Sequence, residues 1–254
     1  SGFSLLQLLA VRSVERNLRP DDIYLHSAVE PQGQWWDRAK MSVQWVPATL
    51  PDRFGVTEDA PAAHHSDVMR MALLLREGGI YMDTDVIALR SFAPLLRQDK
   101  PCLLGEERRV AGHGYALSNA VILARPRAAF LEQWLHELPQ VYQPGCYTCH
   151  SVAHAPRIAA RMARHVRVLP WEAFSAPGWE KQGVDELYRE RATSDEPSDA
   201  ELTRRIKAGA YAIHLFQSHQ NVKGHLAKLT EQYVRTVDTA FNAIVRPLLD
   251  ESLR

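Results

Sequence analysis

This sequence of 254 residues lacks long apolar runs, has few cysteines and shows no excess of either charge. No apolar run approaches the roughly 18 residues that a membrane-spanning helix needs. Its three cysteines are too few for a disulfide scaffold, and no Asn-x-Ser/Thr glycosylation acceptor occurs. Lys plus Arg and Asp plus Glu balance at 30 each, which argues against a nucleic-acid-binding protein, since such proteins carry a basic excess. A chain of this length can build a core without disulfides or metals.

Short apolar runs alternate with helical patterns along the chain. The expected strands are Asp22–His26, Val43–Val46, Ile80–Met82, Val86–Leu89, Cys102–Gly105, Asn119–Ala124, Val166–Leu169 and Tyr211–Leu215. The expected helices are Ser66–Glu77, Arg127–Leu138, Ala155–His165 and Leu226–Val245. This alternation predicts an α/β fold in which helices flank a mainly parallel sheet. The polar, proline-containing segment Ser175–Ala200 is expected to be a mobile excursion.

An acidic pair interrupts the apolar stretch GGIYMDTDVIALR, where Asp83 and Asp85 are separated by Thr84. Strand alternation would place both carboxylates on one side, where they would repel each other and, if buried, cost roughly several kcal/mol. A hard divalent cation, Mn²⁺ or Mg²⁺, would remove that repulsion and bind phosphate oxygens. The alternative is a solvated turn in which Asp83 caps a loop and Asp85 pairs with Arg90.

The helix that precedes this stretch carries a second group of charges. Asp67 and Arg70 lie one turn apart near its start, so they should project from the same end. Ser66 is expected to cap the helix, and Gly78 to end it in a left-handed conformation. An acidic residue in a first helical turn is also favoured by the helix dipole alone.

The combined string AHHSDVMRMALLLREGGIYMDTDVIALRS resembles the DXD-containing sugar-transferase region of glycosyltransferase family 32. Weaker similarity extends to LSNAVILARPRAAFLEQWL, HSVAHAP and YAIHLFQS. The chain is more distantly similar to the clostridial glucosylating toxins. The specific pattern falls on His64, Asp67, Arg70, Leu74, Gly78 to Tyr81, Asp83 and Asp85.

The resemblance implies a GT-A-like, Rossmann-like fold that forms one catalytic domain over residues 1–254. It also implies a metal-dependent, retaining transferase that moves a hexose from a UDP or GDP sugar to a hydroxyl of a glycan, glycolipid or protein. A Golgi or other secretory-pathway location follows from the family, with membrane attachment only through a segment absent from this chain. The family's usual first strand, of the type Ile-Pro-Lys-Ile-Ile-His, has no counterpart in the opening SGFSLLQLLAVRSVERNLRP, so either that strand was trimmed or the base is held differently.

Site roles follow from the resemblance position by position. Asp85 would bind the metal directly, and Asp83 would contact the ribose and the metal's outer shell. Asp67 and Arg70 would hold the donor sugar. Asn119 would contact its hydroxyls, and His214 would add a metal ligand or a diphosphate contact. The implied catalytic set is Asp67, Arg70, Asp83 and Asp85, the donor-binding set is Asp67, Arg70, Asp83 and Asn119, and the metal set is Asp83, Asp85 and His214.

Two other functions remain open at this stage. The chain would be a binding module if the same fold held a nucleotide sugar without turnover, and a metal-dependent phosphodiesterase or nucleotidyltransferase also uses paired carboxylates.

The string CYTCH, Cys146 to His150, matches a c-type haem attachment site, but two thiols or a small disulfide is favoured. The pair Trp35 and Trp36 could form a sugar-stacking platform, but we favour one ring anchored in the core and the other partly exposed. Loops 106–117 and 175–200 would set the acceptor.

Overall fold

A computed structural model describes residues 2–48, 54–57, 59–107, 116–190, 203, 206 and 208–250 of this chain. The chain divides into two compact units. The first unit comprises Ser1–Pro47, Thr84–Ala93 and Glu172–Arg254, and the second comprises Ala48–Asp83 and Pro94–Trp171. Among the described residues, no helix combines the length and the apolar character that crossing a membrane requires.

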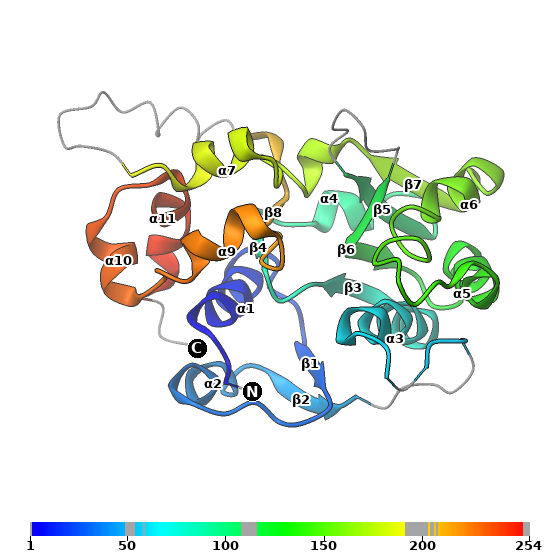
Figure 1. The fold of residues 1–254 in the computed structure, drawn as a ribbon, viewed down its shortest axis with the longest axis horizontal. Helices are drawn as coiled ribbons and strands as arrows, with labels where there is room; N and C mark the ends of the chain where they lie inside the picture. The colour runs from blue at the N-terminus through cyan, green and yellow to red at the C-terminus, as the bar shows by residue number, and fades with distance from the viewer. Residues whose placement is uncertain are drawn as a thin grey trace. The chain divides into compact units, whose positions relative to one another are not determined.

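The second unit is built on a four-stranded sheet with the strand order β3-β6-β5-β7 (Figure 1). Strand β6 pairs antiparallel with β3 and with β5, whereas β5 pairs parallel with β7. Helices lie beside this sheet in the same unit. The elements are α3 (Ala62–Glu77), β3 (Gly79–Met82), α4 (Ala93–Leu96), β5 (Cys102–Glu106), β6 (Leu117–Ala124), α5 (Ala129–Val141), α6 (Ala155–Arg161) and β7 (Val166–Leu169).

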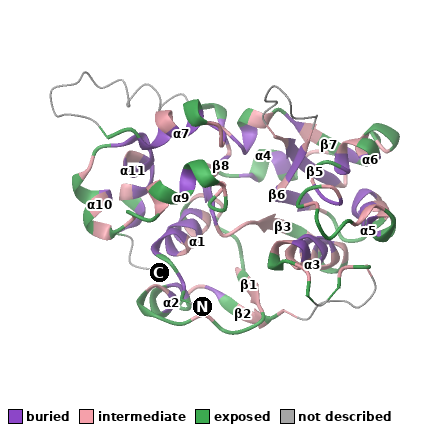
Figure 2. Ribbon diagram, in the orientation of Figure 1, coloured by how far each residue is buried: buried purple, intermediate pink, exposed green. Residues whose placement is uncertain are grey.

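Apolar stripes on α3 and α5 form the core of the second unit. Val68 and Met71 on α3 recur at helical spacing, as do Phe130 and Trp134 on α5. These side chains pack with Ile122 of β6 in one buried cluster. The ribbon of α3, α5 and β6 carries the purple of buried residues in Figure 2. Each fully buried side chain of this size contributes about 1.5–3 kcal/mol to folding, so the cluster fixes α3 against the sheet.

The first unit contains two small sheets and most of the remaining helices. Strands β1 and β2 pair parallel, and β4 and β8 pair antiparallel. Helix α1 begins with a capping box in which Ser4 and Gln7 satisfy each other's backbone N–H groups. The elements are α1 (Leu5–Asn17), β1 (Tyr24–Ser27), α2 (Gln34–Ala39), β2 (Gln44–Pro47), β4 (Val86–Ala88), η1 (Trp171–Ala173), α7 (Lys181–Tyr188), β8 (Ala212–His214), α9 (Gln220–Leu226), α10 (Glu231–Thr236), α11 (Ala240–Val245) and η2 (Arg246–Leu248).

The α/β class expected from the sequence is confirmed, and each expected strand is present with its ends shifted by two residues at most. The sheets are mixed, which corrects the expectation of mainly parallel pairing. Two of the described strand pairings are parallel and three are antiparallel. A strand covered by helices reads as an apolar run whichever way its neighbours point, so the sequence pattern carries no information on direction.

The helix boundaries differ more from expectation. Helix α3 begins at Ala62 after Pro61, so Ser66 does not cap it, whereas Gly78 ends it with φ 70° as expected. The long helix expected over Leu226–Val245 is wrong. Thr230 and Thr239 accept N–H groups of the residues that follow them, and these caps begin the separate helices α10 and α11.

The segment expected to be mobile is also partly corrected. Within Ser175–Ala200, residues 181–188 form helix α7, whose Val184 and Leu187 are buried in the core of the first unit. Residues 191–200 lie outside the described residues, as do residues 108–115 of the other expected acceptor loop.

Candidate functional site

Arg70 is the centre of a buried ion-pair network in the second unit. Its side chain leaves α3 one turn after Asp67, and only 5% of the residue is exposed. Its Nη2 lies 3.3 Å from Asp67 Oδ1, and its Nη1 lies 3.1 Å from Asp83 Oδ1. Its Nη1 also donates to the Asn119 carbonyl oxygen at 2.7 Å, and its Nε donates to the Ser66 carbonyl oxygen at 3.1 Å. One guanidinium therefore ties two carboxylates and strand β6 to helix α3.

Both oxygens of the Asp67 carboxylate have protein partners. Asn119 donates its side-chain Nδ2–H to Oδ1 at 2.7 Å, on the same oxygen that faces Arg70. His150 Nε2 lies 3.1 Å from Oδ2. Asp67 and His150 are both buried, so polar groups of the protein replace water around this carboxylate.

Asp83 directly follows strand β3 and is fixed there by its backbone. Its N–H donates to the Ala120 carbonyl oxygen at 2.8 Å, which continues the pairing of β3 with β6. Tyr81 OH donates to Asp83 Oδ1 at 2.7 Å, and the Arg70 guanidinium lies 4.6 Å from the centre of the Tyr81 ring. The first carboxylate of the Asp-Thr-Asp stretch thus belongs to the network around Arg70.

The ionisation of this network follows from its charges. Burial alone would lower the pKa of Arg70, but Asp83, Tyr81 and Asp67 outweigh it and raise that pKa. Burial raises the pKa of Tyr81 far more than the nearby Arg70 lowers it. Arg70 therefore stays cationic, and Tyr81 stays a neutral hydroxyl donor at physiological pH.

Asp85 forms a separate buried pair with His214 in the first unit. The register of β4 and β8 places Val86 opposite His214, and Asp85 precedes Val86. His214 Nε2 lies 3.5 Å from Asp85 Oδ1, and the Gln217 N–H donates to Oδ2 at 2.8 Å. Burial alone would raise the pKa of Asp85, but His214 and the Gln217 N–H outweigh it, so the pKa is lowered and the carboxylate stays ionised.

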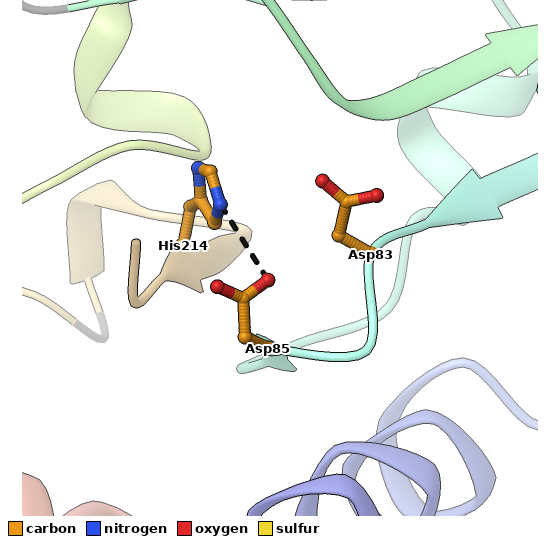
Figure 3. Close-up of side chains that lie close together, drawn as sticks. All are labelled: Asp83, Asp85 and His214. Atoms are coloured by element: carbon orange, nitrogen blue, oxygen red, sulfur yellow. Dashed lines mark ion pairs between the residues drawn. The ribbon is translucent and has the colours of Figure 1, made fainter. Parts of the chain in front are cut away.

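Asp83, Asp85 and His214 form a group that could hold a metal ion. One ligand atom from each lies within 4.8 Å of the others, and Figure 3 shows the contact between His214 and Asp85. Two carboxylates and one imidazole make a donor set that fits Mn²⁺, and fits Mg²⁺ less well because Mg²⁺ prefers oxygen ligands. Asp85 and His214 lie together within the first unit, and Asp83 precedes Asp85 by two residues at the end of β3, so the two carboxylates lie in the turn between β3 and β4 and not within one strand.

The alternative readings of the sequence have clear outcomes. Asp85 does not pair with Arg90, which donates to the carbonyl oxygens of residues 208 and 209 and packs 4.0 Å from the Tyr211 ring centre. Cys146 and Cys149 form a disulfide, so these sulfurs are not free for haem or zinc. Trp36 is buried and Trp35 is partly exposed beneath Arg38, which confirms one core anchor and one partly exposed ring.

Three contributors to the site were missed by reasoning from the sequence. Tyr81 lies in the family pattern, but its hydroxyl contact with Asp83 depends on the exit of the chain from β3. The Gln217 contact with Asp85 uses a backbone N–H, so the residue type at position 217 does not predict it. His150 lies in both CYTCH and HSVAHAP, but neither string indicates its contact with Asp67, from which 83 positions separate it.

Comparison with known proteins bears on the same region. Residues 22–101 match the family model described as the glycosyltransferase sugar-binding region containing a DXD motif. Glucan organizing enzyme 1 of Cryptococcus neoformans var. grubii is 31% identical over 95% of this chain and 63% of its own length. Lactosylceramide 4-alpha-galactosyltransferase of Mus musculus is 26% identical over 88% of this chain and 58% of its own length. The resemblance read from the sequence is therefore confirmed.

A solved structure titled PaToxG Glycosyltransferase superimposes on 98% of this chain and 83% of its own with a TM-score of 0.45 and 16% identity. The chain spans 63% and 58% of the length of the two curated relatives above.

Proposed function

We propose that the protein is a metal-dependent glycosyltransferase that moves a hexose from a UDP or GDP sugar to a hydroxyl of a glycan, glycolipid or protein. In this proposal, residues 1–254 act as one GT-A-like catalytic domain. The observation that carries it is the Asp67–Arg70–Asp83 network beside Asn119, because it joins three charged residues of the family pattern around one buried guanidinium. The family match over residues 22–101 supports the same activity.

In the proposed reaction the residues of the second unit hold the donor. The Asp67 carboxylate accepts hydrogen bonds from hydroxyls of the hexose, and the Asn119 side-chain amide donates to them. Arg70 holds the Asp67 carboxylate and the Asn119 backbone carbonyl in place. Arg70 also supplies positive charge for the diphosphate that departs, and fixed charges of this kind stabilise a leaving group without reorganising. Asp83 accepts a hydrogen bond from the ribose of the nucleotide.

Asp85 and His214, with Asp83, are the proposed ligands of the metal. We propose Mn²⁺, with Mg²⁺ as the weaker candidate, on the grounds of the two-carboxylate, one-imidazole donor set. A bound divalent ion would neutralise charge on the diphosphate as the sugar departs. Asp85 is suited to this role because it is buried and held ionised by its surroundings.

Transfer is proposed to retain the configuration of the anomeric carbon. The bond between that carbon and the phosphate oxygen breaks, the bond to the acceptor oxygen forms on the same face, and the departing phosphate takes the acceptor's proton. Trapping a glycosyl–enzyme intermediate on a carboxylate would contradict this front-face route. We place the reaction in the Golgi or another secretory-pathway lumen, and the Cys146–Cys149 disulfide supports an oxidising compartment.

A panel of UDP and GDP hexoses, each with Mn²⁺, tests the proposed function. Thermal shift reports which donor binds, because a ligand that binds only the folded protein raises the unfolding temperature. Product analysis by mass spectrometry then shows what is released. A nucleoside diphosphate together with a glycoside supports the proposal. Donor binding without turnover would favour the inactive binding module, and release of a nucleoside monophosphate would favour a phosphodiesterase.

A further inference from the structure

His150 is a fully buried ionisable residue to which the proposed function gives no role. Its exposed fraction is 0%, and its Nε2 lies 3.1 Å from Asp67 Oδ2. The other Asp67 oxygen is held by Asn119 at 2.7 Å and faces Arg70 at 3.3 Å. Because the two oxygens have different partners, the contact with His150 determines how the carboxylate is rotated.

The His150 ring is held by packing on several sides. The His64 ring meets it edge-on with centroids 4.5 Å apart, and the Tyr142 ring lies 5.1 Å away. The Trp134 indole Nε1–H donates to the His150 carbonyl oxygen at 2.9 Å, and the disulfide ends at the preceding residue, Cys149. A ring packed on several sides in this way has little freedom to move, so it can impose an orientation on its partner.

The hydrogen on the imidazole can be assigned from its surroundings. His150 Nδ1 is buried and has no hydrogen-bond partner among the described residues, whereas Nε2 faces a carboxylate oxygen. A buried N–H without an acceptor costs more than a bare ring nitrogen beside apolar groups, so Nε2 carries the hydrogen. Nε2–H then donates to Asp67 Oδ2.

We propose that His150 is a positioning residue for the donor site: it donates to Asp67 Oδ2 and so holds Oδ1 toward Asn119 and Arg70. The positioning stands on the geometry of the second unit alone. Its consequence for catalysis, tighter binding of the donor hexose, rests on the proposed function. His150 does not touch the donor in this scheme and acts only through Asp67.

Two substitutions at position 150 distinguish a residue that orients Asp67 through a hydrogen bond from one that only fills space in the core. His150→Leu fills the space without a donor, and His150→Gln restores an N–H donor at similar reach. His154→Leu is the matched control, because His154 is also buried and its Nε2 also contacts a carboxylate, Glu137 Oε2 at 2.8 Å, outside the network. Circular dichroism establishes that each variant is folded, and only folded variants enter the comparison.

Nuclear magnetic resonance tests the geometry without any donor. The side-chain amide signals of Asn119 should shift in His150→Leu, return toward wild type in His150→Gln and stay unchanged in His154→Leu. The ¹⁵N spectrum of the His150 ring should show a protonated Nε2 and a bare Nδ1. An unmoved Asn119 signal in folded His150→Leu, or the opposite tautomer, overturns the positioning whether or not the protein is a transferase.

Kinetics with the donor that the panel identifies tests the consequence. His150→Leu should raise KM for the donor roughly 10- to 100-fold, the effect of losing a hydrogen bond to a charged group, while kcat changes less. His150→Gln should recover most of that loss. Equal kcat/KM for wild type and His150→Leu overturns the catalytic consequence. An inactive wild-type protein would instead contradict the proposed function and leave the Asn119 result to decide the positioning.

Discussion

The two acidic centres of this protein stabilise their carboxylates in different ways. In the second unit, one guanidinium lies between the Asp67 and Asp83 carboxylates, and neutral donors complete the shell. In the first unit, Asp85 has one backbone N–H at 2.8 Å and the His214 imidazole at 3.5 Å. The second distance exceeds the about 2.7–2.9 Å of a strong charge-assisted hydrogen bond.

This difference distinguishes the Arg70 network, whose charges are compensated by the protein alone, from the Asp85–His214 pair, which suits an added cation. Removing a member of the Arg70 network should cost stability even without ligand, because it leaves a buried charge without compensation. Removing the Asp85 charge should cost little stability and should act mainly on metal binding. The predictions below test this division.

The largest effect expected is on catalysis in Asp85→Asn. Loss of this proposed metal ligand should lower the rate of transfer by about 10²- to 10³-fold, the usual cost of removing one group that stabilises charge in a transition state. Stability should fall only modestly, because the amide oxygen can still accept the Gln217 N–H while the charge interaction with His214 is lost. Initial rates and urea unfolding measure the two quantities.

Asp37→Asn is the control for that variant, because Asp37 is an exposed carboxylate that pairs with nearby Lys40 at the surface. It should leave both the rate and the stability unchanged. Full activity in Asp85→Asn would remove the reason for assigning a metal to this centre.

Arg70→Met tests the other side of the comparison. It leaves Asp67 and Asp83 without their shared cation, so the free energy of unfolding should fall by about 3–5 kcal/mol in the absence of any metal or donor. Chemical denaturation measures this loss. Arg38→Met, which removes the exposed pair with Glu231, should cost no more than about 1 kcal/mol. Equal losses in the two variants would mean that the network is not organised in the free protein.

Metal addition should stabilise wild type by a smaller amount. At a Mn²⁺ concentration about 100 times the dissociation constant, binding to the folded state alone adds about 2.7 kcal/mol. The midpoint of thermal unfolding should rise with Mn²⁺ and return on chelation, and Asp85→Asn should show neither change. A response to Zn²⁺ with none to Mn²⁺ would correct the identity of the metal. A rise of the same size in Asp85→Asn would place the bound metal elsewhere.

The sequence predicted the acidic residues of both centres but not how they are partnered. Asp67 and Arg70 follow from helical spacing, and Gly78 from its left-handed conformation at the end of α3. The direction of β6 could not be read, because a covered apolar strand looks the same in either orientation. The contact of His150 with Asp67 could not be read either, since it depends on tertiary packing between a loop and a helix far apart in the chain.

The wrong prediction of one helix over Leu226–Val245 has a local cause. Thr230 and Thr239 sit inside an apolar pattern that continues past them, and the pattern alone predicts one helix over Leu226–Val245. Each threonine hydroxyl instead accepts a backbone N–H and begins a new helix. A capping residue competes with helix continuation by about 1 kcal/mol, and packing decides the outcome.

Glu137 provides a reference for the two acidic centres, because this carboxylate lies in the second unit outside the Arg70 network. Burial alone would raise its pKa, but hydrogen bonds from Gln133, Arg161 and His154 lower it to about 2 from an ordinary value of 4.5. A folded-state pKa below the unfolded one means that ionised Glu137 stabilises the fold above pH 4.5 and loses this contribution as the pH falls toward 2.

The stability difference between wild type and Glu137→Gln should therefore be constant near neutral pH and should shrink between about pH 4.5 and 2. Urea unfolding at a series of pH values measures it, and subtraction of the Glu137→Gln curve removes the titration of the other carboxylates. This effect should be the smallest of the series, because the cluster is close to the surface and Arg161 is largely exposed. A difference that grows on acidification would mean that the Glu137 hydrogen bonds favour the protonated form, and the paired carboxylates of this unit could then not be assumed to be ionised.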